Sequence, residues 1–141
     1  MKANALLILS TILWGIWGIA DKYAVSRAHP YTIQWMFSIP FMVFIPLWYF
    51  LSKRAETGNS FDIQAFGWAT LASVASILAV LLFLFALQSK PASIAVAITS
   101  AYPLVTLALA LILKTEQLTL PKVIGVLLIL AGIGVLQIYG S

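Results

Sequence analysis

The sequence has 141 residues, of which 62% are hydrophobic and 9% charged, whereas soluble domains carry about 25% charged residues. Its mean hydropathy of +1.04 indicates lipid rather than water as the main solvent. The sequence has no cysteine, which excludes a disulfide framework and a thiolate metal site, and its single histidine, His29, excludes a histidine-rich metal site. The net charge of +4 comes from scattered basic residues, which excludes a nucleic-acid-binding patch. No cofactor is expected.

Five segments are apolar enough to cross a bilayer as α-helices, each of which needs about 20 residues. The connections are short, apart from a polar loop over residues 53–62, so consecutive helices are expected to be antiparallel. The chain is therefore predicted to be an all-α integral membrane protein with a single transmembrane domain over residues 1–141. The predicted spans are residues 4–24, 31–52, 64–88, 92–113 and 120–139.

The basic residues predict the orientation of the spans, because cytoplasmic loops carry an excess of Lys and Arg. One side of the membrane would hold Lys2, Lys53, Arg54, Lys114 and Lys122. The other side would hold Arg27 and Lys90, with Lys22 if it counts as a flank. This bias places the N-terminus inside and the C-terminus outside, in what we expect to be a prokaryotic cytoplasmic (inner) membrane.

The first span combines polar, small and aromatic residues on one broad face, made of two stripes with i, i+4, i+7, i+11 spacing. The stripes are Thr11, Gly15, Gly18 and Lys22, and Ser10, Trp14, Trp17 and Asp21. One interpretation is a cavity wall, on which Trp14 and Gly18 would be accessible to a hydrophilic reagent. For Trp14 and Trp17 the alternative is helix packing. The alternative is that Asp21 and Lys22 reach the lipid headgroups, because a charge at mid-bilayer costs about 2.5–3.5 kcal/mol.

The second span carries polar residues and two internal prolines. Gln34 and Ser38 lie one turn apart, with Trp35 beside them. Pro40 and Pro46 each free a backbone carbonyl and kink a helix. The span is therefore predicted to be bent, either as a flexing element or as a static kink.

In the fourth span, Thr99, Tyr102 and Thr106 share a face, and Pro103 is expected to interrupt the helix near mid-membrane. Polar groups beside such a break are typical of a substrate site at the midplane. The alternative is that the hydroxyls donate to backbone carbonyls one turn earlier.

The third and fifth spans carry small residues that are typical of close helix packing. The third is rich in Ala and Ser between Gly67 and Ala79. In the fifth, Gly125 and Gly132 are seven residues apart and lie on one face, which predicts a packing or dimer seam. Whether the partner helix belongs to the same chain stays open.

Catalytic signatures are absent from the sequence, which has no phosphate-binding glycine loop, H-E-x-x-H motif or nucleophile elbow. An intramembrane hydrolase needs a nucleophile together with a base or a metal. The spans offer no histidine, and Asp21 is a carboxylate near a helix end. The protein is therefore not expected to be an enzyme.

Three features are together typical of one family of membrane proteins. They are Trp14-Gly15 followed by Lys22, Tyr102-Pro103, and the stretch from Leu113 to Thr119 before a final span with Gly125 to Gly134. With these features the chain resembles the EamA-type family of the drug/metabolite transporter superfamily. The resemblance covers nearly the whole chain.

Most members of that family have ten helices in two five-helix repeats of opposite orientation. The resemblance therefore implies that the five predicted spans of this chain form one such repeat. The related small multidrug transporters have four helices, dimerise antiparallel and couple protons through a glutamate in the first helix. This sequence has no glutamate there, and Asp21 lies later, so the resemblance does not extend to proton-coupled drug export. Glu116 is interpreted as a helix-connecting or gate residue.

These observations predict a secondary transporter, with export favoured, that moves a small polar or amphipathic metabolite between two half-size units. The partner is a second copy, antiparallel in one arrangement, or a different half-transporter. Two alternatives stay open: a non-transporting subunit of a heteromeric transporter, and a component of a lipid-linked-sugar flippase. The predicted cavity lining is Trp14, Trp17, Asp21, Lys22, Gln34, Trp35, Thr99 and Tyr102.

Overall fold

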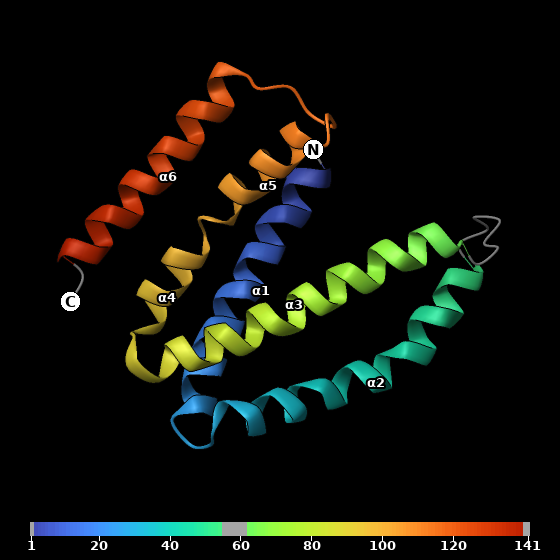
Figure 1. Cartoon of the computed structure of the whole chain (residues 1–141). Coiled ribbons are helices and arrows are strands. Elements are labelled where there is room, and N and C mark those ends of the chain that lie inside the picture. The colour runs from blue at the N-terminus through green and yellow to red at the C-terminus, as the bar shows by residue number, and fades with distance from the viewer. Residues whose placement is uncertain (1, 55–61, 140–141) are drawn as a thin grey trace. The chain divides into compact units, whose positions relative to one another are not determined.

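The computed structural model describes residues 2–54 and 62–139, and every regular element within them is an α-helix. The helices are α1 (Lys2–Val25), α2 (Pro30–Arg54), α3 (Ile63–Ser89), α4 (Ala92–Thr99), α5 (Tyr102–Ile112) and α6 (Leu120–Tyr139) (Figure 1). Among the described residues, five stretches are long and apolar enough to cross a membrane: Ala3–Val25, Pro30–Arg54, Ile63–Ser89, Ala92–Ile112 and Leu120–Tyr139. The predicted fold class, all-α with five spanning helices, is confirmed.

The prolines show where helices begin and where one of them bends. Pro30 is the first residue of α2, Pro91 precedes α4 and Pro121 is the second residue of α6. At these positions the missing N–H removes no helical hydrogen bond. Pro40 and Pro46 instead lie inside α2, and Figure 1 shows that α2 bends along its length, as the loss of hydrogen bonds to the preceding turn favours.

The fourth span consists of two helices, because α4 ends at Thr99 and α5 begins at Tyr102. The interruption predicted at Pro103 therefore comes earlier, and the proline itself lies in the first turn of α5. A proline ring clashes with the carbonyl four residues before it, here that of Thr99, so the helix breaks before the ring is reached. The N–H groups of Ser100 and Ala101 donate to the carbonyls of Val96 and Ile98, at 2.9 and 3.1 Å.

The C-terminus of α5 is closed by a tight turn. The N–H of Lys114 donates to the Leu111 carbonyl at 3.1 Å, and that of Thr115 donates to the Ala110 carbonyl at 2.9 Å. Lys114 has a φ of 55°, in the left-handed region that this turn usually fills with glycine. A residue with a Cβ costs about 1–2 kcal/mol in that conformation.

The chain divides into two compact units, Met1–Ala20 with Ser89–Ser141, and Asp21–Gln88. In the first unit, α4 contacts α6. In the same unit, Gly18 of α1 lies directly against the Val96 side chain of α4. The first unit is thus held by packing of α4 against α1 and α6.

The second unit has its buried residues where the end of α1, the start of α2 and the end of α3 meet. The ring of Phe85 on α3 contacts the rings of His29 and Tyr31, with centroids 5.7 and 5.3 Å apart. The buried residues here are Asp21, Pro30, Ile33, Phe83, Leu84 and Leu87.

Large apolar side chains cover most of the exposed surface. Met42 and Leu128, for example, are 70% and 67% exposed. In the part of the chain that the structure describes, no side chain of α5 or α6 is buried. Surfaces of this kind are stable against lipid or against other helices, not against water.

Candidate substrate-binding site

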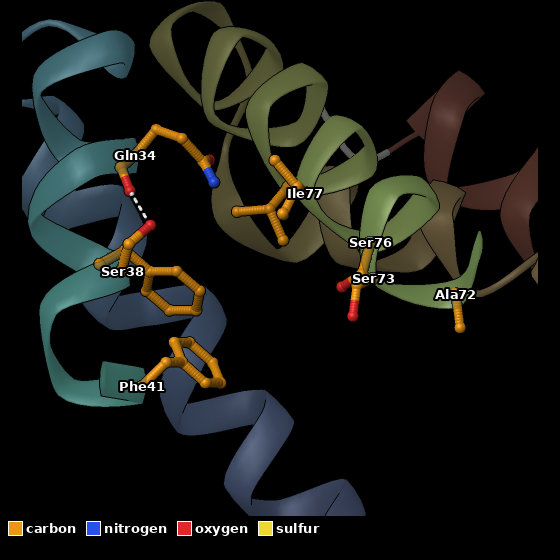
Figure 2. Close-up of a pocket in the computed structure, with 9 residues that line it drawn as sticks. Gln34, Ser38, Phe41, Ala72, Ser73, Ser76 and Ile77 are labelled. Atoms are coloured by element: carbon orange, nitrogen blue, oxygen red, sulfur yellow. Dashed lines mark hydrogen bonds between the residues drawn. The ribbon is translucent and has the colours of Figure 1, made fainter. Parts of the chain in front are cut away.

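A cavity of about 520 Å³ lies between the first half of α2 and the middle of α3 (Figure 2). Ser76 is the central residue of α3, and Phe41 is next to the central residue of α2. The volume lies within the range of about 300–1,000 Å³ that is usual for small-molecule sites. The lining residues are Gln34, Phe37, Ser38 and Phe41 from α2, and Ala72, Ser73, Ser76, Ile77 and Val80 from α3.

The helical period places these residues on facing sides. The four lining residues of α2 follow i, i+3, i+4, i+7 spacing, which is one face of a helix. The five residues of α3 also fall on one face. Figure 2 shows Gln34, Ser38 and Phe41 on one side of the cavity, with Ser76 and Ile77 on the other.

Gln34 provides the most distinctive polar group of the cavity. In Figure 2 its side chain extends from α2 toward Ile77 of α3. Its Oε1 atom is buried and has no hydrogen-bond partner in the described part of the chain. An unpaired buried acceptor costs about 1–3 kcal/mol, and because this oxygen is buried, a molecule in the cavity would donate to it only after the amide turns.

The serine and phenylalanine side chains complete the cavity. Ser38 Oγ donates to the backbone carbonyl of Gln34 at 3.0 Å, which leaves the hydroxyl able to accept a further hydrogen bond. The rings of Phe37 and Phe41 have centroids 5.2 Å apart and meet at 61°, an edge-to-face contact. The cavity thus combines an aromatic wall with a few polar groups, as small-molecule sites commonly do.

The four site residues predicted on α1 differ from one another in burial and in hydrogen bonding. Trp14 is exposed and Trp17 is partly buried. Asp21 is 5% exposed, and its Oδ2 atom has no hydrogen-bond partner within the described residues. Lys22 Nζ donates to the backbone carbonyl of Leu87 at 2.5 Å, one of the last carbonyls of α3, which have no partner within the helix. Lys22 therefore caps the C-terminus of α3.

Gly18 is a packing residue, which corrects the prediction that it is accessible on a cavity wall. A Cβ added there would lie 2.8 Å from Cγ2 of Val96, closer than real Cβ contacts occur. The physical reason is that a glycine lets two helix backbones approach closely. A cysteine at Gly18 is therefore not expected to react with a hydrophilic reagent.

The remaining predicted residues are not among those that line the α2–α3 cavity. Trp35 is exposed and does not line the α2–α3 cavity. The Thr99 hydroxyl donates to the carbonyls of Ala95 and Val96, at 3.1 and 2.9 Å, which is the bonding to the preceding turn considered as the alternative. Tyr102 is exposed and lines a second cavity.

The second cavity, of about 340 Å³, lies along α5 and α6 and includes their connection. Lys122 Nζ forms an ion pair with Glu116 Oε2 at 2.6 Å and donates to the Gln117 carbonyl at 3.1 Å. These contacts tie the connection to the first turn of α6. The lining residues are Tyr102, Pro103, Thr106, Leu107, Glu116, Lys122, Gly125, Val126 and Ile129.

The two glycines predicted to form a seam have open surroundings. A Cβ added at Gly125 or Gly132 would meet nothing within 4 Å. In the described part of the chain, neither glycine makes a close contact with another helix.

Phe37, Phe41, Ser73 and Ser76 line the cavity but are not among the residues that the sequence predicts to bind substrate. The spacing of Phe37 and Phe41 relative to Gln34 is a detectable signal, because it places all three on one face. Ser73 and Ser76 belong to the small-residue helix interpreted as packing. The sequence of α3 does not show that a cavity separates this helix from α2.

Comparison with known proteins gives the family. The model of the EamA-like transporter family matches residues 1–137, so the chain belongs to that family. It is an integral membrane protein with helices sufficient for five spans.

Within curated proteins, the chain is similar to the uncharacterized protein MJ1333.1 of Methanocaldococcus jannaschii, with 38% identity over 77 residues. That match covers 55% of this chain and 56% of the relative, so it spans about half the length of each protein. No solved structure matches the chain.

Proposed function

We propose that the protein is a secondary transporter, favouring export, that moves a small polar or amphipathic molecule and works as a dimer of five-helix units. The observation that carries the proposal is the α2–α3 cavity, whose serines Ser73 and Ser76 lie near the centre of α3 and whose Gln34 lies in the first half of α2, both of them spanning helices. Lipid cannot satisfy the buried Gln34 amide oxygen. A polar solute or water can do so once the amide turns toward the cavity, and this favours a solute path over a purely structural gap.

The open surfaces of the chain support the dimer. The side chains of α5 and α6 are not buried in the described structure, and both seam glycines lack a neighbour. A second copy that packs on this face would give Gly125 and Gly132 the close contact that small residues favour. An antiparallel pair would also reproduce the two opposed repeats that the family resemblance implies.

The buried carboxyl group of Asp21 stays a candidate for the transport path. A carboxylate within a spanning helix is costly unless it is paired or solvated, and its Oδ2 lacks a partner among the described residues. Trp14 is exposed on the same helix and remains a candidate wall residue.

A subunit of a heteromeric transporter is the second candidate function. It is favoured by the chemistry of the α2–α3 cavity, whose lining residues include no acid or base that could carry a coupling proton. For this function, the purified chain is expected to be monomeric and to transport nothing without a partner.

Transport can be tested before the substrate is identified. Liposomes containing the purified chain are loaded with a defined mixture of neutral, cationic, anionic and zwitterionic metabolites, and the external medium is followed by mass spectrometry. We expect a small subset of the mixture to leave faster than from protein-free liposomes. Equal release of every component from both preparations would contradict the proposal for the homomeric protein.

A further inference from the structure

The α2–α3 cavity has no charged side chain in its lining, which consists of glutamine, serine, phenylalanine, alanine, isoleucine and valine. An ion that enters such a space loses hydration and gains no counter-charge, and this is costly. A lining of this kind disfavours ions.

Charged groups on the two helices lie well away from the cavity. Lys53 is twelve residues beyond Phe41 on α2, a distance of about 18 Å along a helix that rises about 1.5 Å per residue. Leu87, whose carbonyl accepts from Lys22, is seven residues beyond Val80 on α3, or about 10 Å. Neither amino group is placed along these helices to offset a negative charge inside the cavity, and the lining includes no carboxylate to offset a positive one.

The groups that do line the cavity match a molecule with an apolar part and an uncharged polar part. Phe37 and Phe41 form an aromatic wall, and Ile77 adds apolar surface on the opposite helix. The Gln34 amide can donate and accept, and the orientation of its oxygen and nitrogen is exchangeable. Figure 2 draws no hydrogen bond from Ser73 or Ser76 to the other lining residues.

We infer that the α2–α3 cavity is the specificity-determining site, and that it selects a neutral amphipathic molecule whose amide or hydroxyl group binds Gln34. This inference rests on the proposed transport function, and it narrows the substrate class from small polar or amphipathic molecules to uncharged ones. The apolar part of the substrate lies against Phe37 and Phe41, and its polar part lies between Gln34 and the serines of α3.

The inference is tested with four compounds that share one ring and differ in charge. They are N-acetylphenylalaninamide, which is neutral, phenylalanine, which is zwitterionic, N-acetylphenylalanine, which is anionic, and phenylalaninamide, which is cationic. Binding to the full chain in nanodiscs is measured by calorimetry and by the shift of the melting temperature, since a ligand stabilises the folded state by mass action. We expect the neutral compound to bind at least tenfold more tightly than each charged one.

Variants at one position of the cavity then test the role of the amide. Gln34→Met keeps the length of the side chain but removes the hydrogen bonds, and we expect it to weaken binding of the neutral compound about tenfold, which corresponds to about 1.4 kcal/mol. Gln137→Met, at an exposed position of α6 outside the cavity, is the matched control and should bind as wild type does. If Gln34→Met does not fold, Ser76→Ala should weaken binding several-fold, with Ser93→Ala as its control.

Three results would overturn the inference: tighter or equal binding of a charged compound, failure of all four compounds to bind, or unchanged binding in Gln34→Met and Ser76→Ala. These results differ from a failure of the transport proposal. Release of charged metabolites from liposomes, unchanged by Gln34→Met, would refute the assignment of the cavity and leave transport standing. Selective binding of the neutral compound without release of any metabolite would refute transport and leave the site standing.

Discussion

Replacing Gly18 with alanine places a methyl group 2.8 Å from Cγ2 of Val96. Overpacking of this kind costs about 1–3 kcal/mol, and Val96 cannot easily turn away, because a β-branched side chain in a helix holds one χ1 rotamer. Alanine also favours the helix over glycine by up to about 1 kcal/mol. The net expectation is a loss of about 0–3 kcal/mol in the free energy of unfolding.

Gly15→Ala is the matched control on the same helix, because a Cβ at Gly15 meets nothing within 4 Å. That variant should be as stable as wild type or up to about 1 kcal/mol more stable. The two variants should therefore differ by about 1–3 kcal/mol. Reversible unfolding by sodium dodecyl sulfate in mixed micelles, followed by tryptophan fluorescence, measures both.

The double variant Gly18→Ala, Val96→Ala identifies the cause of the difference. Removing the valine methyls creates room for the new methyl, so the two substitutions should be less destabilising together than the sum of their separate effects. If Gly18→Ala stabilises the protein as much as Gly15→Ala does, α1 and α4 are not in close contact and the reasoning fails.

Three further predictions concern other parts of the chain. Gly125→Leu and Gly132→Leu should disrupt the dimer, as measured by cross-linking in the membrane, whereas Gly125→Ala and Gly132→Ala should leave the isolated fold intact because a Cβ at either position meets nothing within 4 Å. Retention of the wild-type dimer and transport by the double leucine variant would show that no seam is there. Lys114→Gly should stabilise the protein by about 1 kcal/mol in the same unfolding assay, because it relieves a φ of 55°, and a destabilised variant would contradict that conformation. If the N-terminus lies inside the cell, an external thiol reagent should label Ser141→Cys and not Thr57→Cys, two positions outside the described residues. Comparable labelling of both cysteines is the result that an antiparallel homodimer requires. Labelling of Thr57→Cys alone would show that the topology is reversed.

The number of spans can be predicted from the sequence because a bilayer admits few structures. A chain in lipid must satisfy its backbone hydrogen bonds internally, so an apolar run of about 20 residues forms a helix. The break between α4 and α5 is predicted less accurately. Pro103 is the visible signal, but its steric effect acts on the carbonyl of Thr99, so the helix ends before the proline.

The surroundings of individual residues are harder to predict, because they depend on which helices come close together. Gly18 has the same place in its stripe whether it faces a cavity or the side chain of Val96, and the structure shows the latter. Gln34 is predicted as a polar site residue and does line a cavity. Ser76 is interpreted as packing from the sequence, because a small residue serves equally well at a tight contact and at the edge of a space.

The uncovered faces of α5 and α6 have a consequence for how the protein is made in the cell. In a newly inserted copy these two helices have little side-chain burial to stabilise them, because none of their side chains is buried in the described structure. If a second copy covers them, the stability of each molecule depends on how many copies share the membrane. Lowering the protein-to-lipid ratio should then lower the melting temperature, and cells that make little of the protein should degrade a larger fraction of it.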